Sequence, residues 1–392
     1  MALFFGKLIT RMDRSVFGRP SVAPDWDKEQ NCYTFLDDQG FVLSDFTKKG
    51  YASMMAEDWA RGVFNYPNCR GFERQPVTHY MRPFQLQYDK HKLQSRLFQG
   101  TKQCLESHTF LYQYLDRFIE KYPKSPKIAL TWASNVAHDD ANRLFHFDTQ
   151  LFDFFRAHRE EFDKSYVFLM GDHGLRFGAV RQTWIGNREV NNPMLFVSVP
   201  RHLRRDVVPI LNANGEKLLT SFDVHASFVD ILNHPNIDGK EGPRGLRGNS
   251  LFRPLPEGER TCRTLPIPVR FCLCEWNRTA VKSRKRRDAM GEAATALLNE
   301  RLRSENITEY CKDFTYAGSK KITRIDETRG IHSILFKTEQ CRAEFKAMIR
   351  VNDANGTLNA SLVSDFTRTN SYGKTAECMD WRAELRPICC CK

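Results

Sequence analysis

The stretch SYVFLMGDHGLRFG (residues 165–178) joins a run of apolar strand-forming residues directly to an acid, a histidine and a glycine. The five residues from Tyr166 to Met170 suit a strand that is buried on both faces. Asp172 and His173 follow where this strand ends. In open α/β sheets, ligands bind in loops beyond the carboxyl ends of the strands. The stretch therefore predicts an α/β fold with a functional site at Asp172 and His173.

The flanking sequence continues an alternation of strands and helices. We expect a helix that ends near Gly50 followed by a strand at 51–56, and further strands at 127–134 and 192–200. Apolar residues spaced by three and four predict a helix within 138–162, and a second helix is expected at 221–234. This order favours a mostly parallel central sheet with helices on its faces.

Asp172 and His173 are adjacent, so that both side chains could bind one metal ion. Carboxylate oxygen and imidazole nitrogen are suitable ligands for a divalent metal, zinc or calcium. His138 follows the 127–134 strand and would share the carboxyl edge of a parallel sheet with His173. We expect His138 to be a further metal ligand or to contact an anion. The alternative is that Asp172, His173 and Gly174 form an ordinary polar turn at the end of a strand.

Other polar residues near these strands allow two interpretations each. Arg176 and Arg181 could bind an anionic ester through bidentate hydrogen bonds, or they could be ordinary surface residues. Asp139 and Asp140 are explained by capping of the following helix, although a role as metal ligands stays open. His225 lies among apolar residues at helical spacing, which favours packing, or support of a ligand, over direct ligation.

Cysteines and glycosylation sequons concentrate in the last third of the chain. Of twelve cysteines, Cys32, Cys69 and Cys104 lie early and the other nine follow residue 260. Together they indicate disulfides and an extracellular or secretory-pathway lumenal location. An odd number in the tail means that at least one pairs elsewhere or stays free. The four Asn-X-Ser/Thr sequons are Asn277, Asn306, Asn355 and Asn359.

The composition and charge restrict the possible partners. Hydrophobic residues make up 41% and charged residues 27% of the 392 residues, which is typical of a globular protein. The net charge of +12 favours acidic partners. The densest basic run, KSRKRR at 282–287, is interpreted as a surface loop, a dibasic processing site or a glycan-binding patch. We expect no nucleic-acid partner, because no zinc-finger spacing or aromatic-interleaved module accompanies the charge.

A domain boundary is expected near RPLPEGERTC (residues 253–262), where the composition becomes rich in cysteine. We predict an α/β domain over residues 1–258 and a small Cys-rich, glycosylated region over 259–392. One helix is evident in the second region, RRDAMGEAATALLNERLRS at 286–304.

Several segments together resemble a family of animal extracellular proteins in the sulfatase and alkaline phosphatase superfamily. DHGLRFG (172–178), within a longer match over 168–195, is the most specific of them. The others are GYASMMAEDWARGVFNY (50–66), HDDANRLFHFD (138–148), LNANGEKLLTSFDVHASFVDIL (211–232), RTCRTLPIPVRFCLCEW (260–276) and SYGKTAECMDWRAELRPICCCK (371–392).

This resemblance implies an alkaline phosphatase-like fold and a metal-dependent hydrolase of sulfate or phosphate esters. Asp172 and His173 would bind the metal, and His138 would contact a second metal or the anion. The family's nucleophile lies on an early strand that would precede Met1, together with any secretory signal or membrane anchor. The N-terminal strands and the nucleophile are therefore expected to be missing from this chain. The alternative function is that of a secreted pseudoenzyme or binding protein for acidic glycans.

Overall fold

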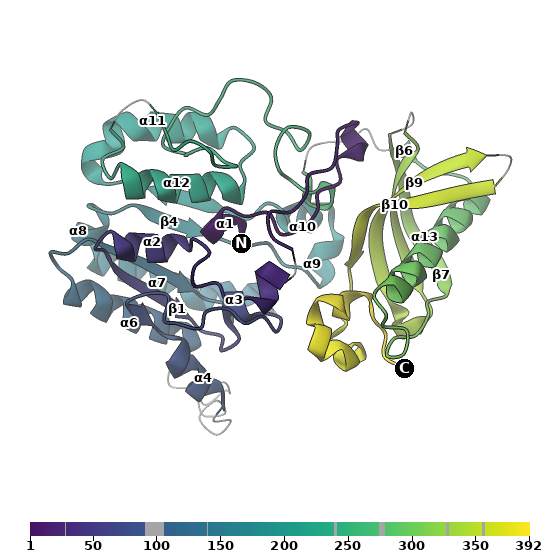
Figure 1. The fold of residues 1–392 in the computed structure, drawn as a ribbon, viewed down its shortest axis with the longest axis horizontal. Helices are drawn as coiled ribbons and strands as arrows, with labels where there is room; N and C mark the ends of the chain where they lie inside the picture. The colour runs from purple at the N-terminus through teal and green to yellow at the C-terminus, as the bar shows by residue number, and fades with distance from the viewer. Residues whose placement is uncertain are drawn as a thin grey trace. The chain divides into compact units, whose positions relative to one another are not determined.

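The computed structural model describes residues 1–27, 29–90, 106–138, 140–238, 241–273, 279–326, 329–354 and 357–392. The chain forms two compact units (Figure 1). Their main division, between Arg260 and Thr261, lies close to the expected boundary at 258, but two short segments from the first domain belong to the second unit. Unit 1 comprises residues 1–10, 24–175 and 193–260, and unit 2 comprises residues 11–23, 176–192 and 261–392.

Unit 1 contains a three-stranded parallel sheet in the order β2-β1-β3. Its strands are β1 (Ala52–Glu57), β2 (His79–Tyr80) and β3 (Lys127–Trp132), and the strands predicted at 51–56 and 127–134 are confirmed. The register pairs β1 with β3 over their whole length, from Ala52–Lys127 to Glu57–Trp132. Both strands therefore end at the same level, and the residues that follow them share one edge of the sheet.

Helices cover both faces of β1. Met54 and Ala56 are fully buried and pack in one apolar cluster with residues of α6 (Ser107–Lys121). Met55 points to the opposite face and packs in another cluster with residues of α2 (Val42–Lys48). Figure 1 shows these helices on either side of the strand. Burial on both faces explains why this strand shows a continuous apolar run and no alternation.

The two remaining strands of unit 1 form a separate ladder. β4 (Val167–Met170) pairs with β5 (Leu195–Ser198) in antiparallel orientation, with Val167 opposite Ser198. The prediction of one mostly parallel sheet is therefore wrong for these strands. Parallel neighbours need a crossover, usually a helix packed on the sheet. The helices between β4 and β5 belong to unit 2, so no helix of unit 1 makes that crossover.

The remaining helices of unit 1 surround these strands. The helix expected within 138–162 is present as α7, but none of its residues is buried, and Phe145 is 71% exposed. The helix expected at 221–234 is present as α12 and begins with a capping box between Thr220 and Asp223. Their bounds are α1 (Ala2–Phe5), α3 (Gly62–Asn65), α4 (Arg82–Lys90), α7 (Phe145–Ala157), α8 (Arg159–Phe162), α11 (Arg204–Gly215) and α12 (Ser221–Asn233).

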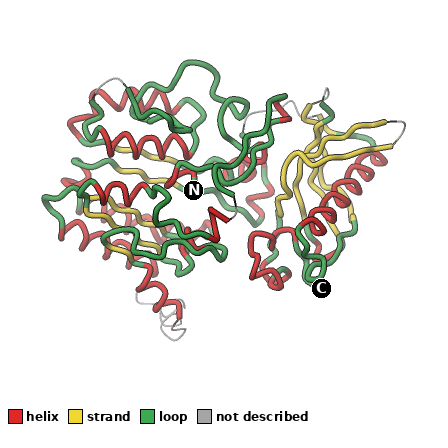
Figure 2. The backbone as a smooth tube through the Cα atoms, viewed as in Figure 1, coloured by secondary structure: helices red, strands yellow, loops and turns green. Residues whose placement is uncertain are grey.

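Unit 2 is built on a five-stranded antiparallel sheet in the order β10-β9-β8-β7-β6. One long helix, α13 (Arg284–Ser304), lies across one face, as Figure 2 shows in red against the yellow strands. The sequence indicated this helix but not the sheet. The strands are β6 (Thr279–Ala280), β7 (Tyr316–Asp326), β8 (Ile331–Thr338), β9 (Glu344–Ala354) and β10 (Thr357–Arg368), and α9 (Ala179–Gln182) and α10 (Trp184–Glu189) are short helices of the same unit.

The face of the sheet toward α13 forms the core of unit 2. Leu298 and Leu302 of the helix are fully buried and pack against Phe336 and Phe345 of the strands. The basic residues Arg284–Arg287 form the first turn of α13 and not a loop. Proteolytic cleavage concentrates in exposed loops, so the structure gives no support to the dibasic processing interpretation.

Five disulfides are present among the described residues. Cys32–Cys69 lies in unit 1, and the other four lie in unit 2. The three consecutive cysteines at the end of the chain each pair with a different part of unit 2. Cys104 and Cys274 lie outside the described residues. The pairs in unit 2 are Cys262–Cys272, Cys311–Cys389, Cys341–Cys390 and Cys378–Cys391.

Two further expectations concern the secretory pathway. No helix in the described part of the chain is long and apolar enough to cross a membrane. The sequon residues Asn306 and Asn359 are exposed, as an acceptor of a glycan must be. Asn277 and Asn355 lie outside the described residues.

The packing of α13 on the sheet leads to a stability prediction. A Cβ atom at Gly291 would lie 2.2 Å from a ring carbon of Tyr316, so Gly291→Ala should destabilise unit 2 by about 1–3 kcal/mol. An alanine in an unobstructed helix would instead add stability. Gly215→Ala in α11 is the matched control, since no atom lies within 4 Å of its added Cβ. Urea unfolding measures both variants, and an unchanged or raised midpoint for Gly291→Ala contradicts the packing.

Candidate functional site

Asp172 and His173 lie directly after β4, as the sequence predicts. Nδ1 of His173 lies 2.8 Å from the carbonyl oxygen of Gly174. Because a carbonyl oxygen can only accept, Nδ1 carries the proton and Nε2 keeps its lone pair. The backbone N–H of His173 donates to Oδ1 of Asp172 at 2.8 Å, which leaves Oδ2 available. Oδ2 and Nε2 are 3.6 Å apart, on side chains 49% and 40% exposed.

His138 lies in the loop after β3 and is exposed. Because β3 and β4 belong to separate ladders, the shared parallel edge expected for His138 and His173 is not formed by hydrogen-bonded strands. Within the described ranges, no group of three possible ligand atoms within 4.8 Å includes either histidine. The three-residue metal site therefore stays a prediction.

Of the two acidic residues beside His138, the structure describes only Asp140. Asp139 lies outside the described residues. Oδ1 of Asp140 accepts a hydrogen bond of 2.9 Å from the backbone N–H of Asn142, at the start of a 3₁₀ turn (Ala141–Leu144) that leads into α7. The capping interpretation of Asp140 is therefore confirmed.

Arg176 and Arg181 belong to unit 2, whereas Asp172 and His173 belong to unit 1. Arg181 donates to Oδ1 of Asn187 at 2.7 Å, and burial lowers the pKa of its guanidinium. The guanidinium of Arg176 lies 5.9 Å from the ring centre of Phe177. These contacts lie within unit 2, and a role of either arginine in anion binding stays a prediction.

Asp58 connects three segments at the edge of the parallel sheet through hydrogen bonds of its side chain. The sequence did not indicate this role. Asp58 follows β1 and is only 1% exposed. Its Oδ1 accepts hydrogen bonds from the backbone N–H groups of Ser134 (2.6 Å) and Asn135 (3.2 Å), at the start of the loop that carries His138. Its Oδ2 accepts a hydrogen bond of 3.2 Å from the hydroxyl of Ser107, at the start of α6. One carboxylate thus connects β1, α6 and the loop after β3.

Glu57 is the last residue of β1 and is also buried, with 6% of its surface exposed. Its Oε1 accepts a hydrogen bond of 2.8 Å from the backbone N–H of Val63. Burial raises the pKa of this carboxyl to about 7, although the Val63 hydrogen bond and the charge of Arg82 lower it in part. Burial raises the pKa of Tyr80 to about 12, and the negative charge of Glu57 adds to this effect. A carboxyl that titrates near neutral pH at a sheet edge is a feature of many functional sites.

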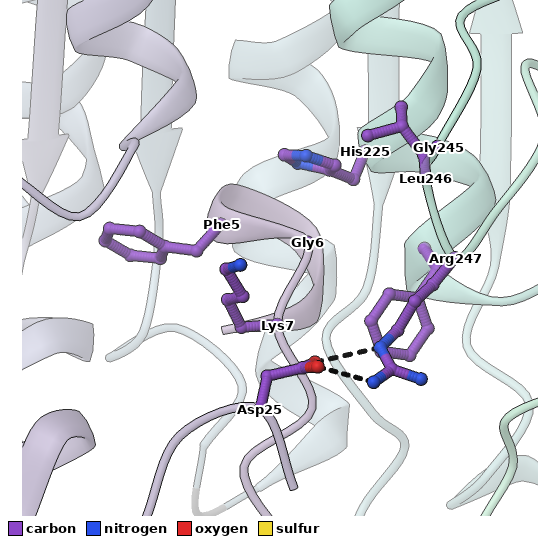
Figure 3. Close-up of a pocket in the computed structure, with 9 residues that line it drawn as sticks. Phe5, Gly6, Lys7, Asp25, His225, Gly245, Leu246 and Arg247 are labelled. Carbon is purple, nitrogen blue, oxygen red and sulfur yellow. Dashed lines mark hydrogen bonds and ion pairs between the residues drawn. The ribbon is translucent and has the colours of Figure 1, made fainter.

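His225 of α12 lies against α1 and next to a cavity of about 280 Å³ (Figure 3). Its Nδ1–H donates to the carbonyl oxygen of Leu3 at 3.0 Å. Its Nε2 lies so close to Gly6 that a Cβ atom there would be 2.7 Å away, and Gly6 also has a φ of +64°. Burial lowers the pKa of His225. The histidine therefore has the packing role that its sequence context predicts.

An ion pair closes another side of this cavity. Arg247 donates through Nε and Nη2 to the two carboxylate oxygens of Asp25, as the dashed lines in Figure 3 show. This hydrogen bonding is the main cause of the lowered pKa of Asp25. Lys7 also lines the cavity. The pair fixes the 24–27 segment against the loop that contains Arg247.

The strands, helices and polar residues of unit 1 define an α/β protein with ionisable residues after its strands. The chain belongs to the family described as "Protein of unknown function (DUF229)", whose model matches residues 1–319. The match covers unit 1 and continues into β7 of unit 2. No curated protein matches, and no solved structure matches.

The raised pKa of Glu57 predicts how stability changes with pH. The folded state binds this proton more tightly than the unfolded state, so the contribution of Glu57 to stability is greatest below about pH 4.5 and is lost as the pH rises through about 7. Glu57→Gln keeps an oxygen acceptor for Val63 and removes the charge. We expect it to match the native protein at pH 4 and to be more stable at pH 8, by up to about 3 kcal/mol.

The measurement is urea unfolding at pH 4, 6 and 8. The matched control is Glu73→Gln, which removes a charge from an exposed glutamate of the same unit. A stability difference for Glu57→Gln that does not grow between pH 4 and 8 contradicts the assignment.

Proposed function

We propose that the chain provides part of the metal centre of a hydrolase for sulfate or phosphate esters. The observation that carries this proposal is the geometry of Asp172 and His173 after β4. The family to which the chain belongs is sulfatase-like, which supports the same class of reaction. The five disulfides support an extracellular or secretory-lumenal location.

The Asp172–His173 pair fits two ligands of one divalent ion. Ligands of a tetrahedral zinc ion lie about 2.0–2.2 Å from the metal and therefore roughly 3.3–3.6 Å from each other. The separation of 3.6 Å between Oδ2 of Asp172 and Nε2 of His173 agrees with this distance. A metal-bound histidine usually donates its second ring N–H to a carbonyl or carboxylate. The bond from Nδ1 of His173 to Gly174 has this form.

Each residue has a distinct part in the proposed centre. Asp172 and His173 would hold the ion, and His138, on the loop after β3, would contact a second metal or the substrate anion. A bound divalent ion would lower the pKa of a nucleophile and neutralise charge on the transferring group.

Metal content tests the proposal independently of activity. The double variant Asp172→Ala/His173→Ala should lose most of the zinc or calcium that copurifies with the native protein, measured by elemental mass spectrometry after dialysis. The reason is that both proposed ligand atoms are removed, while the two side chains are exposed and their loss leaves no buried cavity.

The matched control is His202→Ala/Asp206→Ala, which removes an exposed histidine and aspartate elsewhere in unit 1. It should keep the native metal content. Equal metal content in the native protein and the Asp172/His173 variant would show that this pair is not the metal site.

A further inference from the structure

The whole net charge of the protein resides in unit 2. This unit contains 30 of the 59 lysines and arginines but only 18 of the 47 aspartates and glutamates. Unit 1 therefore contains 29 residues of each sign and is neutral, while unit 2 has the full +12. A charge confined to one compact unit points to a function of that unit, because a soluble fold does not require such an imbalance.

Part of this charge lies on the face of the sheet that points away from α13. Residues paired across neighbouring strands point to the same side. Lys321 of β7 is opposite Leu335 of β8, and Leu335 is opposite Lys346 of β9. Ile334 and Phe345, the sequence neighbours of Leu335 and Lys346, pack toward α13. Lys321, Leu335 and Lys346 therefore form one row on the opposite face.

The next row adds another lysine and the only carboxylate of this group. Lys337 is opposite Glu344, and Lys320 reaches the same carboxylate at 2.6 Å. Glu344 is 14% exposed, whereas Lys337 is 47% exposed. We call Lys320, Lys321, Lys337 and Lys346, together with Glu344, the lysine face. The four lysines and Glu344 together have a formal charge of +3.

Ion pairs with Glu344 account for the positions of Lys320 and Lys337. Lys321 and Lys346 are each opposite Leu335 and lie diagonally from Lys337 on the neighbouring strand, at roughly 7–8 Å. Farther along the same face, apolar residues such as Ile331 and Met348 are buried in a small cluster with Val16 and Val269. The lysine face is thus the part of this surface that is not included in an apolar cluster. The exposed sequon residue Asn359 of β10 is paired with Asn352 of β9. Asn352 lies six residues from Lys346 along the same strand, so Asn359 is roughly 20 Å from Lys346.

The basic run at the start of α13 has a different geometry. Successive residues of a helix point about 100° apart, so the side chains of Arg284–Arg287 diverge and cannot all contact one linear polyanion. Arg284 also lies 3.7 Å from Asp288. On the sheet, by contrast, rigid strands keep Lys321, Lys337 and Lys346 on one side.

We propose that the lysine face of unit 2 binds a sulfated polysaccharide of the glycosaminoglycan type. Its flat row of ammonium groups suits a linear polymer that carries repeated sulfate and carboxylate groups. The disulfides of unit 2 favour an oxidising compartment, where such glycans occur and nucleic acids do not. This binding is independent of the proposed ester hydrolysis, because it needs neither the metal nor a nucleophile.

The test compares two variants of the full chain that each lose three positive charges. Lys321→Gln/Lys337→Gln/Lys346→Gln should reduce affinity for a heparin octasaccharide at least about tenfold at 0.15 M salt, measured by surface plasmon resonance. Lys285→Gln/Arg286→Gln/Arg287→Gln should change it by less than about threefold. Replacement of the same three lysines on the lysine face by arginine should keep binding, because the charges remain.

Unfolding midpoints establish that each variant is folded, and the arginine variant provides the comparison if the glutamine variant does not fold. Unsulfated heparosan should bind weakly. Equal losses in the two glutamine variants, or a loss only in the α13 variant, would overturn the assignment to the lysine face. Equally tight binding of single-stranded DNA would overturn the assignment to a sulfated glycan.

Discussion

The buried carboxylate of Asp58 is the interaction on which the edge of the parallel sheet in unit 1 depends. Asp58 directly follows β1. Its carboxylate accepts hydrogen bonds from the loop after β3 and from the first residue of α6. Burial raises its pKa, and hydrogen bonds from Ser134, Asn135 and Ser107 oppose this effect. A buried carboxylate needs such donors to offset the cost of its burial. The contact fixes the first residues of the loop that carries His138.

The sequence predicted those parts of the fold that local patterns determine. The strands β1, β3, β4 and β5 are short apolar runs bounded by polar residues, and the helices α7 and α12 show the expected spacing. Asp172 and His173 were predicted as a site because they interrupt an apolar run abruptly. Their hydrogen bonds leave Oδ2 and Nε2 as the two proposed ligand atoms, an arrangement that depends on backbone geometry that no motif encodes.

Long-range pairing could not be predicted in the same way. The direction of β5 relative to β4 depends on where the chain between them packs, and those residues join unit 2. The sheet of unit 2 was missed although β9 alternates charged and apolar residues from Glu344 to Ala347, because the cysteines and sequons dominated the interpretation of this region. The role of Asp58 was missed because its partners are backbone groups far away in the sequence.

The two units differ in what stabilises them and in the chemistry they offer. Unit 1 has neutral overall charge, and ionisable residues follow its strands, buried at Asp58 and exposed at His138, Asp172 and His173. Unit 2 has the excess positive charge on a sheet that a helix covers on one side and four disulfides crosslink. Crosslinks reduce the freedom of the unfolded chain, which lets the sheet tolerate lysines that repel one another. A unit that retains unfavourable charge in this way is better explained by a partner of opposite charge than by the needs of its own fold.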